Sequence, residues 1–269
     1  MSNQWDLPDE LPTDLPVARC ELPDGRVVSA VQEAEAHTLW EEISSAEPYR
    51  RAAEGIGAGE TVIDVGAHIG LASLLFARLA PERRLMAFEP APKAYACLEE
   101  NLARHLPGAS AHRQALGAVP GKSELIYRPY VASASTLYAD AEDDTRNLEA
   151  HLDNIDADVQ TREVVRRTFA VTQRIPVEVT TLTAVMAEHG VDRVGLLKVD
   201  VERGELDVLD GIDPGVWPRI RRVLLEVHDI EGRLGRVVSR LSGLGFRATV
   251  SQWGVYVGGS VHLVLAERG

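Results

Sequence analysis

From residue 61 onward, short apolar segments of strand length alternate with longer segments of helical periodicity. Strands are predicted at 61–65, 84–88, 110–114, 176–180, 194–199 and 221–227, followed by two final strands at 246–251 and 261–266. Helices are predicted at 70–79, 91–105, 182–189, 204–210 and 232–243. Because consecutive parallel strands need a long crossover connection, usually a helix, this alternation predicts an α/β fold with a doubly wound, mostly parallel sheet.

Two regions depart from this alternation. Residues 1–54 contain an acidic, Pro-rich arm, then a Pro-Asp-Gly turn between two apolar runs, then helical spacing with a break near Pro48. They predict an N-terminal extension made of an arm, a hairpin and a helical cap, ahead of one main domain at 55–269. Residues from about 128 to 176 form an acidic insertion with a helical stretch at "TREVVRRTFAV". This insertion is either a solvated surface segment or a mobile lid over a site.

The composition argues against several classes of partner. The 269-residue chain has a formal net charge of −13 at pH 7, which repels a phosphate backbone, so we expect no nucleic acid partner. Two cysteines are too few for a disulfide framework or a zinc cluster. No apolar run approaches the ~20 residues of a membrane span, and the N-terminus lacks a signal-peptide pattern. We therefore expect a cytoplasmic protein without a membrane partner, and a homodimer stays open.

The loop after the first strand, "DVGAHIG", is placed where doubly wound sheets bind their ligands. Gly66 and Gly70 leave out side chains where the chain bends and where a ligand approaches. Asp64 ends this strand and Glu89 follows the next one, so two acids face the expected ligand. An acid beside a pyrophosphate is repulsive, and the loop lacks the G-x-G-x-x-G pattern of dinucleotide sites. The pattern favours an adenosine with a cationic tail and no phosphate, which describes S-adenosylmethionine.

Two further residues extend this candidate cofactor site. Gln114 follows the third strand, where an adenine edge would be read, or it is simply a polar strand end. Ser135 in "VASASTLY" lines the cofactor or begins the insertion. The residues expected to bind the cofactor are Asp64, Gly66, His68, Gly70, Glu89, Gln114, Ser135 and Asp200.

A second group of polar residues ends two later strands, in "LLKVDVERGELDVL" and "RRVLLEVHD". Alternation along a strand puts Lys198 and Asp200 on one face, and likewise Glu226 and His228. If these strands are neighbours, four side chains meet at one sheet edge: Asp200, Glu202, Glu226 and His228. Taken singly, each is also explained as a helix-dipole partner or a satisfied strand end.

These four residues are the expected catalytic groups. Methyl transfer from a sulfonium needs an acceptor atom aligned with the methyl group, and a hydroxyl acceptor benefits from a base. His228 is the expected base, oriented by Glu226 or Asp200. A carboxylate acceptor would need no base, and His228 would then donate a hydrogen bond. A less favoured alternative is that Asp200, Glu226 and His228 hold Mg²⁺ against the acceptor oxygen.

Taken together, "TVIDVGAHIG", "LMAFEP", "VTTLTAVM", "LLKVDVERGELDVL" and "LLEVHDIEGRL" resemble the FkbM family of S-adenosylmethionine-dependent methyltransferases over about residues 40–265. The resemblance implies a Rossmann-like class I methyltransferase fold with a seven-stranded sheet, and S-adenosylhomocysteine as the product. It also implies mostly O-methylation of hydroxyls, with carboxyl methylation in some members. The acceptors it implies are small-molecule or carrier-bound intermediates of antibiotic and other specialised biosynthesis.

Two positions depart from the family pattern. His68 stands where the family usually has Asn, which alters a contact near the methionine tail. Arg203-Gly204 replaces the commoner Gly-Ala and leaves both neighbouring acids in place. Three rival functions stay open: a carboxyl or N-methyltransferase, an NAD-dependent oxidoreductase, and a catalytically silent interaction module. The missing third glycine disfavours the oxidoreductase, and the intact acid clusters disfavour the silent module.

Overall fold

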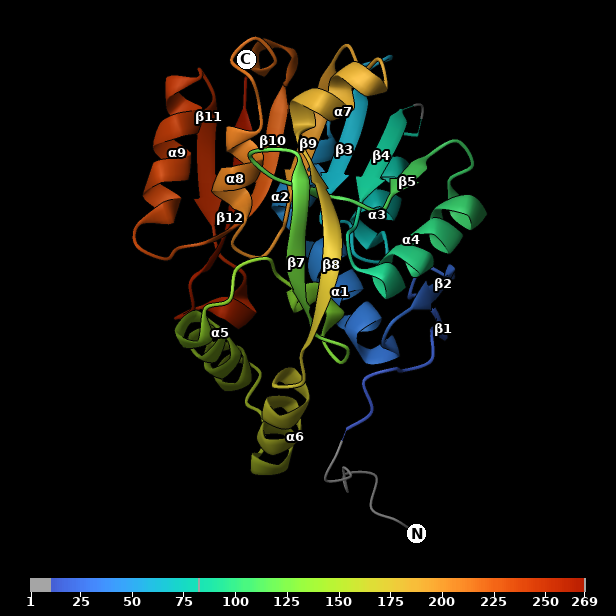
Figure 1. The fold of residues 1–269 in the computed structure, drawn as a ribbon, viewed down its shortest axis with the longest axis vertical. Coiled ribbons are helices and arrows are strands. Elements are labelled where there is room, and N and C mark those ends of the chain that lie inside the picture. Colours follow the sequence, from blue (N-terminus) through green and yellow to red (C-terminus); the bar gives the residue numbers. More distant parts are fainter. Residues whose placement is uncertain (1–10, 82, 269) are drawn as a thin grey trace.

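The computed structural model describes residues 11–81 and 83–268 (Figure 1). Its central sheet has seven strands in the order β11-β12-β10-β9-β3-β4-β5. All neighbours pair in parallel except β12, which runs antiparallel to both of its neighbours. The strands are β3 (Thr61–Val65), β4 (Arg84–Phe88), β5 (Ser110–His112), β9 (Val194–Val199), β10 (Arg222–His228), β11 (Arg247–Ser251) and β12 (Val261–Glu267). The predicted doubly wound, seven-stranded sheet is confirmed.

The crossover helices cover both faces of this sheet, as the parallel topology requires. They are α3 (Leu71–Leu79), α4 (Pro92–His105), α7 (Leu182–Glu188), α8 (Glu205–Asp210) and α9 (Arg233–Gly243). Successive β3 residues point to opposite faces, so Val62 joins one buried apolar cluster and Ile63 the other. Thr181 caps α7 by accepting a hydrogen bond from the Ala184 amide. None of the helices in residues 11–81 and 83–268 combines the length and the apolar composition of a membrane span.

The N-terminal region packs against the helices of one sheet face. It contains the antiparallel hairpin β1 (Ala18–Glu21) and β2 (Val27–Ala30), then α1 (Glu33–Ser45) and α2 (Glu47–Ala53). Pro48 lies in the first turn of α2, which confirms the predicted break between the two helices. Helices α1 and α2 contact α3 and share its buried cluster. Residues 1–10 of the predicted arm lie outside the described residues.

The insertion is more structured than the sequence indicated. Two antiparallel strands flank it, β7 (Gly121–Tyr127) before it and β8 (Gln173–Thr180) at its end. They form a separate three-stranded sheet with β6 (Ala115–Leu116). The prediction missed β7, and the strand predicted at 176–180 lies in this small sheet, outside the central one. The burial of β7 and β8 alternates because only one side of each is covered, unlike the fully buried runs of the central sheet.

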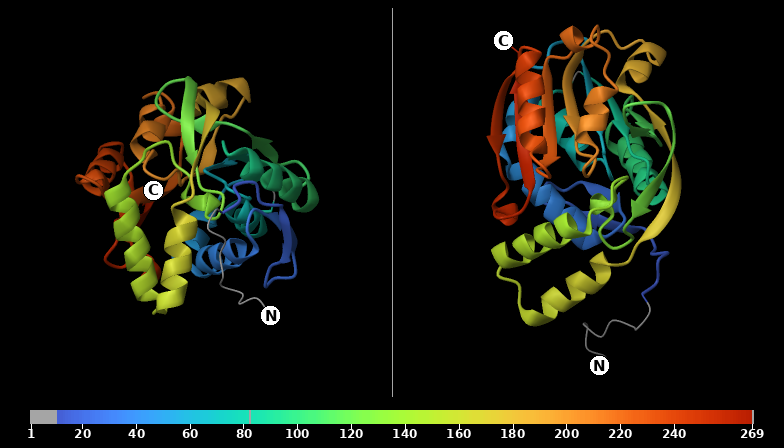
Figure 2. Two further views of the ribbon diagram at one scale, coloured as in Figure 1. Left: turned by 60° about the horizontal axis from the view of Figure 1, so that its bottom comes forward. Right: turned by 60° about the vertical axis from the view of Figure 1, so that its left-hand side comes forward.

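Two helices complete the insertion, α5 (Ala141–Asn154) and α6 (Val159–Phe169). The stretch "TREVVRRTFAV" is helical, as predicted. Both helices lie at the end of the molecule toward which the arrowheads of β3 and β4 point (Figure 1), and the side view in Figure 2 shows them below the central sheet. The insertion therefore lies at the carboxyl ends of the parallel strands, where α/β proteins bind ligands.

Candidate active site

A cavity of about 480 Å³ opens at the carboxyl ends of β3, β4 and β9. Its floor is formed by the segments that follow these strands, and its walls come from α1, α2, the small sheet and the 3₁₀ turn Ala132–Ala134. The volume lies within the ~300–1,000 Å³ range of small-molecule sites. Predicted residues that line it are Gly66, His68, Glu89, Gln114, Ser135, Asp200 and Glu202.

The glycines of the loop after β3 are required by close contacts. Gly66 has φ +71°, and a Cβ there would lie 1.6 Å from the Asp200 carbonyl oxygen. Gly70 has φ +91°, and a Cβ there would lie 2.8 Å from a methyl carbon of Leu98. Only glycine meets both demands without strain. Gly66 thus brings the loop against the end of β9, whereas Gly70 serves packing on α4 and does not line the cavity.

Asp64 is buried beneath this loop and contacts side chains of the protein interior. Its side chain is fully buried, accepts a hydrogen bond of 2.7 Å from the Ser73 hydroxyl, and lies 3.2 Å from Nζ of Lys198. Lys198 Nζ also donates to the Gly66 carbonyl and lies 3.2 Å from Asp200 Oδ2. Asp64 is absent from the cavity wall. The contact between Asp64 and the ligand that the sequence suggested is therefore replaced by an internal ion pair.

The ammonium of Lys198 ties the two strand ends together. Burial alone lowers the pKa of Lys198, but Asp200 and Asp64 outweigh burial and hold the pKa above its usual value. Lys198 therefore stays charged and neutralises part of the acidic surface. Asp200, the more exposed of its two partners, faces the cavity.

Glu89 is positioned by the backbone on both sides of its carboxylate. Oε2 accepts the His68 amide at 2.9 Å, and Oε1 accepts the Ala91 amide at 2.8 Å. Burial raises the pKa of Glu89 to about 7, although the two amides act in the opposite direction. Each oxygen keeps acceptor capacity for one more donor. The carboxylate can therefore accept two adjacent hydroxyls, such as those of a ribose.

Glu35 also belongs to the site, although no sequence pattern predicted it. His68 has φ +50°, and neither ring nitrogen has a hydrogen-bond partner among the residues that the structure describes. Its Nε2 lies 3.6 Å from Glu35 Oε2, which is also buried without such a partner. Glu35 Oε1 accepts the backbone amide and the hydroxyl of Ser133. Buried polar atoms normally have partners, so this pair is suited to polar groups of a ligand.

Burial, aided by Lys198, lowers the pKa of His68, although Glu35 and Asp200 oppose this shift. A neutral imidazole offers one donor and one acceptor nitrogen. Because Glu35 lies among other acids on a surface helix, its sequence context resembles a solvated helix face, and only the packing of α1 on the loop reveals its place.

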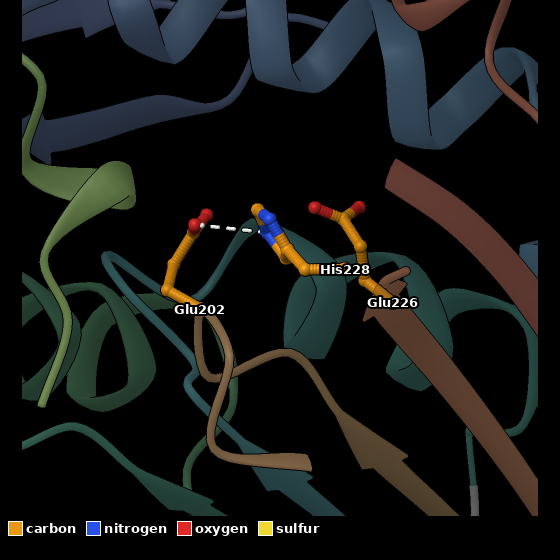
Figure 3. Close-up of side chains that lie close together, drawn as sticks. All are labelled: Glu202, Glu226 and His228. Atoms are coloured by element: carbon orange, nitrogen blue, oxygen red, sulfur yellow. Dashed lines mark ion pairs between the residues drawn. The ribbon is translucent and has the colours of Figure 1, made fainter. Parts of the chain in front are cut away.

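Glu202, Glu226 and His228 converge at the ends of β9 and β10, and we call them the acid–histidine cluster. One ligand atom from each lies within 4.8 Å of the other two. His228 Nε2 lies 3.0 Å from Glu202 Oε2, and Figure 3 shows the imidazole between the two carboxylates. The neighbouring strands thus bring together three of the four predicted catalytic residues. Asp200 is paired with Lys198 and is not part of this cluster.

The charges of this cluster shift the pKa values of its members. Burial alone would lower the pKa of His228, but Glu202 and Asp143 raise it well above its usual value. The two carboxylates therefore favour the protonated imidazole, which donates from both ring nitrogens, and the role of His228 as the base stays a prediction. Burial, with the charges of Asp200 and Glu202, raises the pKa of Glu226 well above its usual value.

The insertion supplies residues that sequence reasoning missed. Asp143 of α5 accepts a hydrogen bond from His228 Nδ1 at 3.0 Å, and Asn147 anchors α5 to Ser260. Arg203, nearly fully buried, pairs with Asp143 at 3.0 Å and with Asp144. Burial raises the pKa of Asp143, but His228 and Arg203 outweigh it and hold the pKa well below its usual value.

The first turn of α5 is therefore an ionised, inward-facing part of the site rather than a solvated segment. The departure from Gly to Arg at position 203, opposite an acidic run, is the signal that could have linked the two segments. Ser135 lines the cavity, and its Oγ accepts the Arg128 amide. Whether the insertion moves as a lid stays a prediction.

The chain is similar to several known proteins. Residues 64–248 match the methyltransferase FkbM domain family. The chain is 35% identical over 258 residues to 31-O-demethyl-FK506 methyltransferase FkbM of Streptomyces tacrolimicus, covering 94% of this chain and 97% of that protein. It is 31% identical over 252 residues to AMB antimetabolite synthetase AmbE of Pseudomonas aeruginosa, covering 86% of this chain but 12% of AmbE.

A solved structure shares the fold. A methyltransferase FkbM from Methylobacillus flagellatus matches with a TM-score of 0.50 at 12% sequence identity, covering 77% of this chain and 43% of that one.

Proposed function

The chain belongs to the FkbM family of methyltransferases, and on this premise we propose that it transfers the methyl group of S-adenosylmethionine to a hydroxyl oxygen of a small molecule. One observation carries the proposal: a single cavity is bordered by Glu89 on one side and by Glu202 of the acid–histidine cluster on another. The first suits an adenosine, and the second suits an acceptor that must lose a proton.

S-adenosylmethionine fits the first part of this cavity by its chemistry. The ribose hydroxyls donate to Glu89, and the adenine lies beside Gln114 and the turn that follows it. The methionine tail runs along the loop that contains Gly66. Its ammonium group lies toward Glu35 and Asp200, and its carboxylate lies near His68. A phosphate-free, cationic ligand suits these carboxylates, whereas a pyrophosphate would be repelled.

The reaction is an in-line displacement at the methyl carbon. The acceptor oxygen forms the new C–O bond while the C–S bond breaks, and its electron pair stays on sulfur, which gives S-adenosylhomocysteine. The chain contributes by aligning the acceptor and by excluding water. The hydroxyl proton passes to the acid–histidine cluster, where two carboxylates and an imidazole lie together. A carboxylate acceptor needs no such cluster, which favours a hydroxyl.

The two curated relatives support a small-molecule acceptor from specialised metabolism. One is named for 31-O-demethyl-FK506, and the other is an antimetabolite synthetase of which the chain matches only a part. We propose an acceptor of this kind, either free or tethered to a carrier protein.

Calorimetric titration tests the cofactor first. We expect binding of S-adenosylhomocysteine and none of NAD, and the reverse result would exclude the proposal. Transfer of labelled methyl groups to panels of hydroxyl, carboxyl and amine acceptors then tests the reaction. Binding without transfer to any acceptor would favour a catalytically silent module.

A further inference from the structure

The acid–histidine cluster has the donor set of a metal site. It offers two carboxylates and one imidazole whose ligand atoms lie within 4.8 Å of one another. Two ligands at ~2.1 Å from an ion are at most ~4.2 Å apart, so small rotations of the long glutamate side chains are enough to enclose an ion. Figure 3 shows both carboxylates flanking the same imidazole ring.

His228 is arranged as a ligand would be. Its ring is buried, with 3% exposure, and Nδ1 is hydrogen-bonded to Asp143. Nε2 lies 3.0 Å from Glu202 Oε2 but forms no hydrogen bond of acceptable geometry. Histidines that bind metals usually donate their second ring N–H to a carboxylate, which turns the other nitrogen toward the ion. Asp143 provides this support, and Arg203 and Asn147 hold Asp143 in place.

The negative charge of the cluster also favours a bound metal ion. Arg203 neutralises Asp143 and Asp144, and Lys198 neutralises Asp64 and Asp200. Within residues 11–81 and 83–268, neither Glu202 nor Glu226 forms an ion pair with a lysine or arginine. Two adjacent, partly buried carboxylates beside one imidazole therefore form a site that a bound cation would stabilise.

We propose that Glu202, Glu226 and His228 bind one divalent metal ion beside the cavity. An imidazole with two carboxylates suits Mn²⁺, Fe²⁺, Co²⁺ or Zn²⁺ better than Mg²⁺, which prefers oxygen ligands. Three protein ligands leave positions open for an oxygen of the acceptor. That last role rests on the proposed function, whereas the binding of the ion does not.

Titration of the chelator-treated full chain with Mn²⁺ tests the site, by calorimetry and by the electron paramagnetic resonance signal of the free ion. We expect one bound ion per chain. Glu226→Gln and His228→Gln should weaken binding by at least ~10-fold, and Asp143→Asn by ~10-fold or more through the orientation of His228. Glu47→Gln removes an exposed carboxylate far along the chain from the cluster and should bind Mn²⁺ as the wild type does.

Thermal unfolding of each variant shows whether it is folded, and Glu226→Gln, with nearly unchanged volume, keeps the test valid if His228→Gln does not fold. Absence of binding of Mn²⁺, Zn²⁺ and Mg²⁺ by the wild type would overturn the inference, as would equal binding by folded Glu226→Gln. Parallel titrations with S-adenosylhomocysteine separate the two proposals. Metal binding without nucleoside binding would refute the proposed function alone, whereas methyl transfer unaffected by chelation, without metal binding, would refute the metal site alone.

Discussion

The two sides of the cavity are built by different means. On the cofactor side, Glu89 is held by backbone amides two and 21 residues away along the chain, and Gly66 is required by a backbone contact. On the acceptor side, His228 depends on Asp143, 85 residues away, and Asp143 depends on Arg203, 60 residues away. The cofactor side is thus built mainly from backbone groups, whereas the acceptor side is an assembly of buried charges from distant segments.

This difference has a functional consequence. A backbone-built subsite suits a cofactor that does not vary, while side chains contributed by an insertion can change with the acceptor. The two sides should therefore respond separately to substitution, and each of the following changes tests that separation.

The largest effect is expected for Gly66→Ala. Its Cβ would overlap the Asp200 carbonyl, so the loop or the end of β9 must move, and we expect a loss of more than ~4 kcal/mol in the free energy of unfolding. Denaturant unfolding measures this loss, and calorimetric titration with S-adenosylhomocysteine measures the accompanying change in cofactor binding. Gly235→Ala in α9 is the matched control, because a Cβ there meets nothing within 4 Å and alanine favours a helix. Near-equal stability of the two variants would contradict the packing argument.

Arg203→Met should affect the acceptor side alone. It removes the arginine partner of the buried Asp143, and breaking a buried pair costs ~3–5 kcal/mol, whereas Asp144 keeps its second partner, Arg128. We expect faster amide hydrogen exchange in α5 and loss of methyl transfer, with binding of S-adenosylhomocysteine retained. If cofactor binding falls together with α5 protection, the two sides are not independent.

Glu89→Gln should affect the cofactor side alone. Loss of a charged acceptor for the ribose hydroxyls costs ~1.5–3 kcal/mol, which corresponds to a ~10- to 100-fold weaker binding of S-adenosylhomocysteine. Mn²⁺ binding at the acid–histidine cluster should be unchanged. Glu54→Gln, an exposed change before β3, serves as the control.

The pKa of Glu89 adds a dependence on pH. Because this pKa is raised to about 7, the carboxyl is largely protonated at pH 6 and accepts fewer hydrogen bonds. Affinity for S-adenosylhomocysteine should therefore rise between pH 6 and 8, by up to ~10-fold per unit below the pKa. The stability of the free protein should fall as pH rises from about 4.5 to about 7, because in this range the folded carboxyl holds a proton that the unfolded chain has lost. Glu89→Gln should abolish the trend in affinity and reduce the trend in stability, to which Glu42, with a pKa also raised to about 7, contributes as well.

The smallest effect is expected for Glu35→Gln. We expect S-adenosylhomocysteine to bind ~3- to 10-fold more weakly, which corresponds to about one hydrogen bond, because Glu35 faces the methionine tail in our proposal. Binding of 5′-methylthioadenosine, which lacks the amino-acid tail, should not change. An equal loss for both ligands would place Glu35 in a structural role only.

Several elements could be predicted from the sequence almost to the residue. The strands at 61–65 and 194–199 match the structure, because continuous apolar runs act locally. The meeting of Glu226 and His228 with Glu202 also followed from strand alternation and the order of a doubly wound sheet. In contrast, β7 was missed because its half-buried alternation is a weaker signal.

The amino-acid sequence by itself determined the doubly wound sheet, the glycine loop and the strand ends where polar residues gather, since these depend on periodicity and on backbone conformation. Only the tertiary structure decided that Asp64 faces inward to Lys198, that Glu35 meets His68, and that α5 brings Asp143 to His228. These are contacts between segments far apart in the chain, and their partners are chosen by packing and by the cost of burying an unpaired charge. An acidic run can be solvated or can hold a buried histidine, and only its neighbours in space distinguish the two.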